Sequence, residues 1–139
     1  MTDPHINITS QEFVDAQGDA PVALLLCADL MFNVQLQNIA RAEGFRIVNL
    51  RPGAPIPPEA TVLVVNLADL GRTRSWESSV REASEQSITV IGFGPHVDTE
   101  TRRLAKESGA SRVLANSNLT RDLPTILRSL RPSRTQEEL

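Results

Sequence analysis

Short apolar segments and longer polar segments alternate along this chain, and the apolar segments predict β-strands. Each is a nearly continuous run of apolar residues, which is typical of a strand that is buried on both faces of a parallel sheet. The runs cover residues 21–27, 46–50, 61–66, 88–92 and 111–115. Parallel strands need crossover connections, and these are usually helices.

The segments between the runs predict amphipathic helices, because their apolar residues recur every three or four positions. Helices are expected at residues 31–43, 75–86 and 100–108. Thr120 is expected to cap a last helix, with Pro124 in its first turn, where a missing N–H is tolerated. Alternating strands and helices indicate an α/β domain in three layers. We predict a flavodoxin-like, five-stranded parallel sheet with strand order 2-1-3-4-5.

The connection between the second and third strands breaks this alternation. Residues 51–60 contain four prolines and one glycine, so no helix longer than about one turn can form there. A Pro-rich loop therefore replaces the helix that would connect these two strands. We expect part of one sheet face to be uncovered, and such an apolar patch is typically filled by a partner, a second copy or the N-terminal segment.

One domain accounts for most of the chain. The whole chain has 139 residues, which is enough for a single domain with a substantial core. We expect a polar N-terminal extension at residues 1–20, in which the capping-box spacing of Thr9 and Glu12 predicts a short helix. The domain itself is expected at residues 21–131, followed by a polar tail at residues 132–139.

The charge distribution limits the classes of partner. A net charge of −3 gives the whole chain no attraction for nucleic acid or acidic lipid. Residues 101–134 nevertheless contain eight basic and two acidic residues, which indicates either a solvated helical face or a docking surface for an acidic partner. Because aromatic residues do not interleave with the basic ones, nucleic acid is not an expected partner.

The expected location is the cytoplasm. Cys27 is the only cysteine and ends an apolar run, so we expect a small buried core residue in a reducing compartment, not a nucleophile. The N-terminus is polar, and no apolar stretch approaches the ~20 residues of a membrane helix. Neither a signal peptide nor a membrane association is therefore expected.

Polar residues follow the predicted strands at their carboxyl ends, where ligands bind in open α/β sheets. Asn66 ends the third strand, while Asp29, Gly94, His96 and Asn116 follow the first, fourth and fifth strands. These five residues are the candidate pocket. No nucleotide-binding glycine motif, metal-ligand spacing or nucleophile accompanies them, so we predict no catalytic, cofactor-binding or metal-ligating residue.

Several short motifs resemble the receiver domains of bacterial two-component response regulators, and the resemblance spans residues 21–130. The sequence AEGF at residues 42–45 closes the first helix, and KESGA at residues 106–110 precedes the fifth strand. DLMF at residues 29–32 and GFGPHVD at residues 92–98 are similar to a group of small bacterial receiver-like proteins. The resemblance implies a receiver fold and a role in signalling.

The same resemblance implies which chemistry is lost. A working receiver has an acidic cluster after the first strand, a phosphoacceptor Asp ending the third, a Ser or Thr ending the fourth and a Lys ending the fifth. The carboxylates hold Mg²⁺, and the Lys pairs with the phosphoryl group. The corresponding positions here are Asp29 alone, Asn66, Gly94 and Asn116. The resemblance therefore implies a non-enzymatic pseudo-receiver, a protein-interaction or regulatory module that is not phosphorylated at the usual position.

Three alternatives stay open from the residues alone. Asp69 would be a displaced phosphoacceptor, three residues beyond the usual position. The protein would be a small-ligand or metabolite sensor that binds its ligand in the vacated candidate pocket. His96 and Asp98 would form an acid–base pair, although Asp98 is also placed to cap a helix. In every case the expected macromolecular partner is an unidentified protein, with a homodimer as one option.

Overall fold

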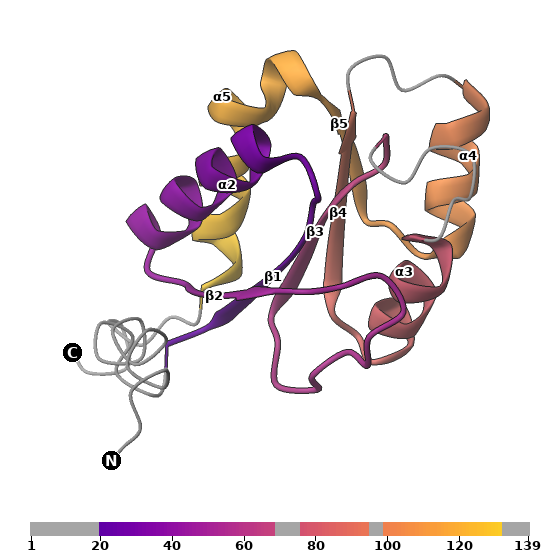
Figure 1. The fold of residues 1–139 in the computed structure, drawn as a ribbon, viewed down its shortest axis with the longest axis horizontal. Coiled ribbons are helices and arrows are strands. Elements are labelled where there is room, and N and C mark those ends of the chain that lie inside the picture. The colour runs from indigo at the N-terminus through magenta and orange to yellow at the C-terminus, as the bar shows by residue number, and fades with distance from the viewer. Residues whose placement is uncertain (1–19, 69–75, 95–98, 132–139) are drawn as a thin grey trace.

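The computed structural model describes residues 20–68, 76–94 and 99–131 (Figure 1). Within these ranges, strands and helices alternate except between the second and third strands, which no helix separates. The elements in chain order are β1 (Val22–Leu26), α2 (Leu30–Ala42), β2 (Arg46–Asn49), β3 (Val62–Asn66), α3 (Trp76–Glu85), β4 (Thr89–Gly94), α4 (Thr99–Ser108), β5 (Arg112–Ala115) and α5 (Asn116–Leu130).

Some of the sequence predictions lie outside the described residues. These are the short helix near Thr9, the tail from residue 132, and the candidate residues Asp69, His96 and Asp98. None of the helices within the described ranges combines the length and the apolar character of a membrane-spanning segment.

The structure confirms the predicted sheet topology. All pairings are parallel, and the strand order is β2-β1-β3-β4-β5. At the centre, Leu25 of β1 is aligned with Asn49 of β2 on one side and with Val64 of β3 on the other. Because the strands run in the same direction and in register, their carboxyl ends meet along one edge of the sheet.

Side chains alternate between the two faces of the sheet and build two separate cores. In β1, Leu24 belongs to the core beneath α3 and α4, whereas Leu25 belongs to the core beneath α2 and α5 (Figure 1). Trp76 is buried in the first core and Phe93 in the second. Both faces of the central strands are thus covered, which is why these strands lack an alternating pattern in the sequence.

The Pro-rich loop between β2 and β3 packs onto the sheet in place of a helix. Its Ile56 is 3% exposed and belongs, with Ala60, to the same core as Trp76. Two hydrogen bonds fix the loop to α3: the Ile56 N–H donates to Glu82 Oε2 (3.1 Å), and Gln86 Nε2 donates to the Ile56 carbonyl (3.3 Å). The loop itself therefore fills much of the face that the sequence analysis expected to be uncovered.

A small part of that face stays open at the edge of the sheet. Val48 of β2 is aligned with Leu24 of β1, so both side chains point toward the loop side of the sheet. Leu24 is completely buried, whereas Val48 is 38% exposed. The missing helix thus leaves only the edge strand partly uncovered.

The last helix begins earlier than predicted. It starts at Asn116 and not after Thr120, so Pro124 lies in its interior and not in its first turn. A proline here removes the hydrogen bond to the Thr120 carbonyl, and because Thr120 is exposed, water can replace that bond. The reason for the earlier start is a buried stripe with a spacing of four residues. It consists of Leu119, Leu123 and Leu127.

Gly109, after the end of α4, holds α4 close to α3. Its φ angle is +124°, a conformation that side chains disfavour. A Cβ atom added at this glycine would lie 2.4 Å from the Cβ of Ser84 in α3. Both the backbone conformation and the close approach therefore require glycine here.

Gly109→Ala is expected to lower the free energy of unfolding by about 3 kcal/mol, since backbone strain of about 1 kcal/mol adds to overpacking of about 1–3 kcal/mol. Urea denaturation followed by circular dichroism measures this loss. Gly53→Ala is the matched control: Gly53 also has a positive φ (+82°), but nothing lies within 4 Å of an added Cβ. The control is expected to lose only about 1 kcal/mol. Equal losses in the two variants would contradict the packing argument.

Candidate functional site

The structure places four of the five candidate residues at the same edge of the sheet. Asn66 is the last residue of β3 and Gly94 the last of β4, while Asn116 follows β5 directly and Asp29 precedes α2. The fifth candidate, His96, lies outside the described residues. These four residues share one edge because the strands are parallel and their carboxyl ends therefore lie together. That these residues form a pocket stays a prediction.

Asn66 is buried and holds the turn that follows β3. Asn66 is only 5% exposed. The side-chain Oδ1 accepts a hydrogen bond from the Ala68 N–H (3.0 Å), which is the geometry of an Asx turn. Its Nδ2 lies 3.9 Å from Cys27 Sγ at the end of β1. The amide is thus used structurally, and an amide has no ionised oxygen with which to form an acyl phosphate.

Asp29 caps the N-terminus of α2. Its Oδ1 accepts a hydrogen bond from the Phe32 N–H (3.0 Å), and its carbonyl accepts from the Asn33 N–H (2.8 Å). This is the standard role of Asp at an N-cap, where it satisfies one of the free N–H groups of the first turn. Cys27 and Ala28, which separate β1 from Asp29, supply no second carboxylate. Cys27 is buried, as the sequence predicted.

The ends of β4 and β5 carry no charged or hydroxyl side chain. Gly94 is buried and has no side chain to offer a phosphoryl group. Asn116 Oδ1 is buried and accepts no hydrogen bond from the described residues. A buried acceptor without a donor costs about 1–3 kcal/mol. Within the ranges that the structure describes, no cluster of three or more His, Cys, Asp or Glu side chains is placed to hold a metal ion.

The basic segment at residues 101–134 is partly neutralised by acidic side chains from outside it. Arg128 makes a two-pronged ion pair with Glu43 of α2 (2.8 and 3.1 Å), and this hydrogen bonding raises the pKa of Arg128. Arg103 pairs with Glu100 (2.6 Å), which likewise raises the pKa of Arg103. The positive charge of this segment is therefore compensated by more acidic residues than the two that lie within it.

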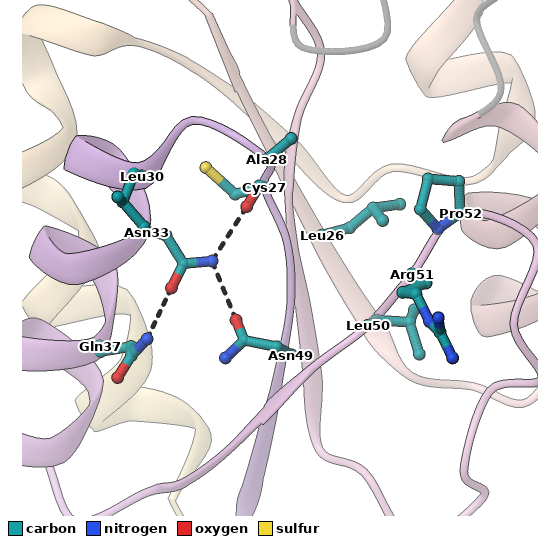
Figure 2. Close-up of a pocket in the computed structure, with 10 residues that line it drawn as sticks. All are labelled: Leu26, Cys27, Ala28, Leu30, Asn33, Gln37, Asn49, Leu50, Arg51 and Pro52. Atoms are coloured by element: carbon teal, nitrogen blue, oxygen red, sulfur yellow. Dashed lines mark hydrogen bonds between the residues drawn. The ribbon is translucent and has the colours of Figure 1, made fainter.

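A pocket of about 400 Å³ lies at the carboxyl ends of β1 and β2, beside the predicted position (Figure 2). Three amide side chains on its lining are connected to one another. Asn33 Nδ2 donates to the Cys27 carbonyl (2.9 Å) and to Asn49 Oδ1 (2.9 Å), while Gln37 Nε2 donates to Asn33 Oδ1 (2.6 Å). We call Asn33, Gln37 and Asn49 the amide cluster.

The amide cluster was not predicted from the sequence. Asn33 and Gln37 lie one helical turn apart on α2, and polar residues at that spacing usually belong to a solvated helix face. The signal that was available is Asn49, a polar residue that ends the second strand, where ligands gather in such sheets. None of the four sequence candidates that the structure describes lines this pocket.

Comparisons with known proteins identify the fold. No protein-family model matches this sequence, and no curated protein matches it. Solved structures do match. A CheY-like protein (tadZ) from Pseudomonas aeruginosa has a TM-score of 0.63 at 19% identity and covers 79% of this chain and 98% of its own. A response regulator receiver domain from Clostridium thermocellum has a TM-score of 0.62 at 14% identity, covering 86% and 99%.

A third structure, a protein from Burkholderia pseudomallei that is named as related to pilus assembly, gives a TM-score of 0.61 at 14% identity and covers 83% of this chain and 94% of its own. At these identities the likeness establishes the fold and leaves the activity open. The matches cover 79–86% of this chain and 94–99% of the other chains, so the similarity concerns the whole sheet with its helices. The described residues therefore have a receiver-like fold, a five-stranded parallel sheet of flavodoxin-like topology.

Proposed function

We propose that this protein is a non-enzymatic, receiver-like regulatory module that acts through contacts with another protein and is not phosphorylated at the usual strand-end position. The observation that carries the proposal is Asn66 at the end of β3. In a receiver this position holds the carboxylate that attacks phosphorus, and an amide cannot replace it in that reaction. The Asn66 amide instead bonds to its own turn.

The neighbouring positions support the same proposal. Phosphoryl transfer to a carboxylate depends on Mg²⁺ and on a cation that balances the phosphoryl charge. Asp29 is the only carboxylate directly after β1, and it caps α2. Asn116, an uncharged amide, follows β5 where a receiver has its Lys. The positions that would hold the metal and the phosphoryl group thus lack the charges for both.

The uncharged stretch of α2 supports the interaction role. From Leu30 to Ala40 this helix contains no charged residue. Leu30 and Met31 are each 77% exposed, and Val34 is 50% exposed. Protein interfaces are depleted of charge at their centre and enriched in Met, so these residues have the composition of a contact surface. We call Leu30, Met31 and Val34 the α2 apolar surface.

The structural neighbours are compatible with such a role. They are named as response regulators or receiver domains, and one is named as related to pilus assembly. Control of a signalling protein and participation in an assembly both require protein contacts and neither requires catalysis by this domain. Localisation in the cytoplasm and membership of a bacterial two-component pathway belong to the proposal.

Incubation with acetyl phosphate and Mg²⁺ is expected to leave the intact mass of the protein unchanged, because no carboxylate is available at residue 66. Intact-protein mass spectrometry measures the result, with a receiver domain that has a complete acidic site as the positive control. A phosphoryl adduct that disappears in Asn66→Ala or in Asp69→Ala would overturn the proposal. The second variant tests the displaced acceptor.

Asn66→Asp is expected to destabilise the fold more at pH 7.5 than at pH 4.5. Burial raises the pKa of the introduced carboxyl above the value of about 3.9 in the unfolded chain. The folded state then binds the proton more tightly, so stability falls as the pH rises from about 4 toward the folded-state pKa. A shift of one pKa unit corresponds to about 1.4 kcal/mol.

Urea denaturation at both pH values, with and without Mg²⁺, measures this effect. Asn66→Ala is the control, because its stability relative to wild type should not depend on pH in this way. Mg²⁺ is expected to restore nothing. If Mg²⁺ recovered the stability of Asn66→Asp at pH 7.5, the pocket would retain a metal site, and the proposal that this site is degenerate would be wrong.

Combined Leu30→Gln and Met31→Gln substitutions are expected to abolish the complexes of the wild-type protein while leaving its thermal melting temperature unchanged. Self-association is measured by sedimentation, and other partners by cross-linking in the native cell with mass spectrometry. Val48→Gln is the control, since Val48 is a partly exposed apolar residue on the loop side of the sheet. Loss of the complexes in the control alone would assign the contact to that opposite side.

A further inference from the structure

The pocket beside the amide cluster has the size and position of a small-molecule site. Its volume of about 400 Å³ lies within the range of about 300–1,000 Å³ that is typical of ligand pockets. It opens at the carboxyl ends of β1 and β2, between the start of α2 and the Pro-rich loop (Figure 2). Leu30 lines it from α2, while Leu50 and Pro52 line it from the loop that replaces a helix. The loop that replaces the helix thus forms one wall of this pocket.

The amide cluster is fixed in place by its own hydrogen bonds. Asn33 donates both of its amide hydrogens, one to the Cys27 carbonyl and one to Asn49 Oδ1. Its Oδ1 accepts from Gln37 Nε2. Asn33 is therefore fully bonded, and it orients Gln37 and Asn49 on either side of itself. A polar group that is held in this way binds a ligand at a lower entropic cost.

The cluster leaves one acceptor and one donor group unused. Gln37 Oε1 and Asn49 Nδ2 form no hydrogen bond with any described residue. An amide oxygen accepts and an amide nitrogen donates. A complementary ligand therefore presents both an N–H group and a carbonyl group.

The charge of the lining disfavours a cationic ligand. Among the residues that the structure describes, Arg51 is the only charged one on the lining, and no carboxylate of this part of the chain lies there. The remaining lining is largely apolar, with Leu26 and Ala28 beside the leucines already named. An apolar ring with an uncharged polar edge matches this combination.

We propose that this pocket binds a small heterocyclic amide, a class that includes nucleobases and pyridine carboxamides. The ring packs against the apolar lining, its N–H donates to Gln37 Oε1, and its carbonyl accepts from Asn49 Nδ2. The inference does not depend on the proposed function, because it involves neither Asn66 nor phosphorylation. It places a ligand site at the end of β2, away from the pocket predicted at Asn66 and Asn116.

The test uses nicotinamide and uracil as two separate probes and 3-acetylpyridine as the matched control, which is also neutral and keeps the carbonyl group but lacks the amide N–H. The full chain, labelled with ¹⁵N, is titrated to about 10 mM, a concentration that detects a Kd near 1 mM. Either probe is expected to shift the side-chain amide signals of Asn33, Gln37 and Asn49. 3-Acetylpyridine is expected to bind about tenfold more weakly than nicotinamide, because it offers no N–H donor to Gln37 Oε1.

Variants on one helix identify the contact. Gln37→Ala is expected to weaken binding about tenfold, whereas Gln35→Ala, the same change on the exposed side of α2, is expected to leave it within about twofold. Asn49→Ala supplies an independent test on the edge strand and should also weaken binding about tenfold. Thermal melting establishes that each variant is folded.

The proposal is overturned if neither probe shifts these amide signals, or if 3-acetylpyridine binds as well as nicotinamide. It is also overturned if Gln37→Ala and Asn49→Ala, both folded, bind as tightly as the wild type. A response to uracil alone would assign the site to nucleobases, and a response to nicotinamide alone would assign it to pyridine carboxamides. The acetyl phosphate result has no bearing on any of these outcomes.

Discussion

Burial of the central strands on both faces is the constraint on which the rest of this structure depends. β1 and β3 are buried along their whole length, so neither can carry a polar side chain before its last residue. Polar groups are therefore displaced to the carboxyl ends of the strands, where they meet because the sheet is parallel. The edge strand β2 tolerates weaker coverage, and this is why a loop anchored by Ile56 can stand in for a helix there.

The strands were predictable from the sequence because short, continuous apolar runs that are bounded by polar residues are typical of buried strands. The start of α5 was not, since the polar residues after Ala115 have the composition of a loop, and Leu119 became informative only when its burial was known. The amide cluster was hidden for a related reason. Its members come from α2 and β2, and only the fold brings Asn33 within hydrogen-bonding distance of Asn49.

The loss of charged groups at the strand ends has an energetic side. Ionised groups that are withdrawn from water cost several kcal/mol each unless partners compensate them. A pocket lined by carboxylates and a Lys therefore depends on metal and phosphate to balance its charges. Asn66 and Asn116 avoid that requirement because an amide is neutral at every physiological pH. The domain thus holds its strand ends together without a counter-ion, at the cost of the reaction that a carboxylate would allow.

Leu30 connects the two surfaces, because it belongs both to the α2 apolar surface and to the lining of the pocket. A molecule in the pocket and a protein on α2 would both touch this side chain. Two ligands that share a residue in this way are thermodynamically linked, and each changes the affinity of the other by the same factor. Whichever sign the coupling has, the first turn of α2 would convert occupancy of a small pocket into a change in protein association.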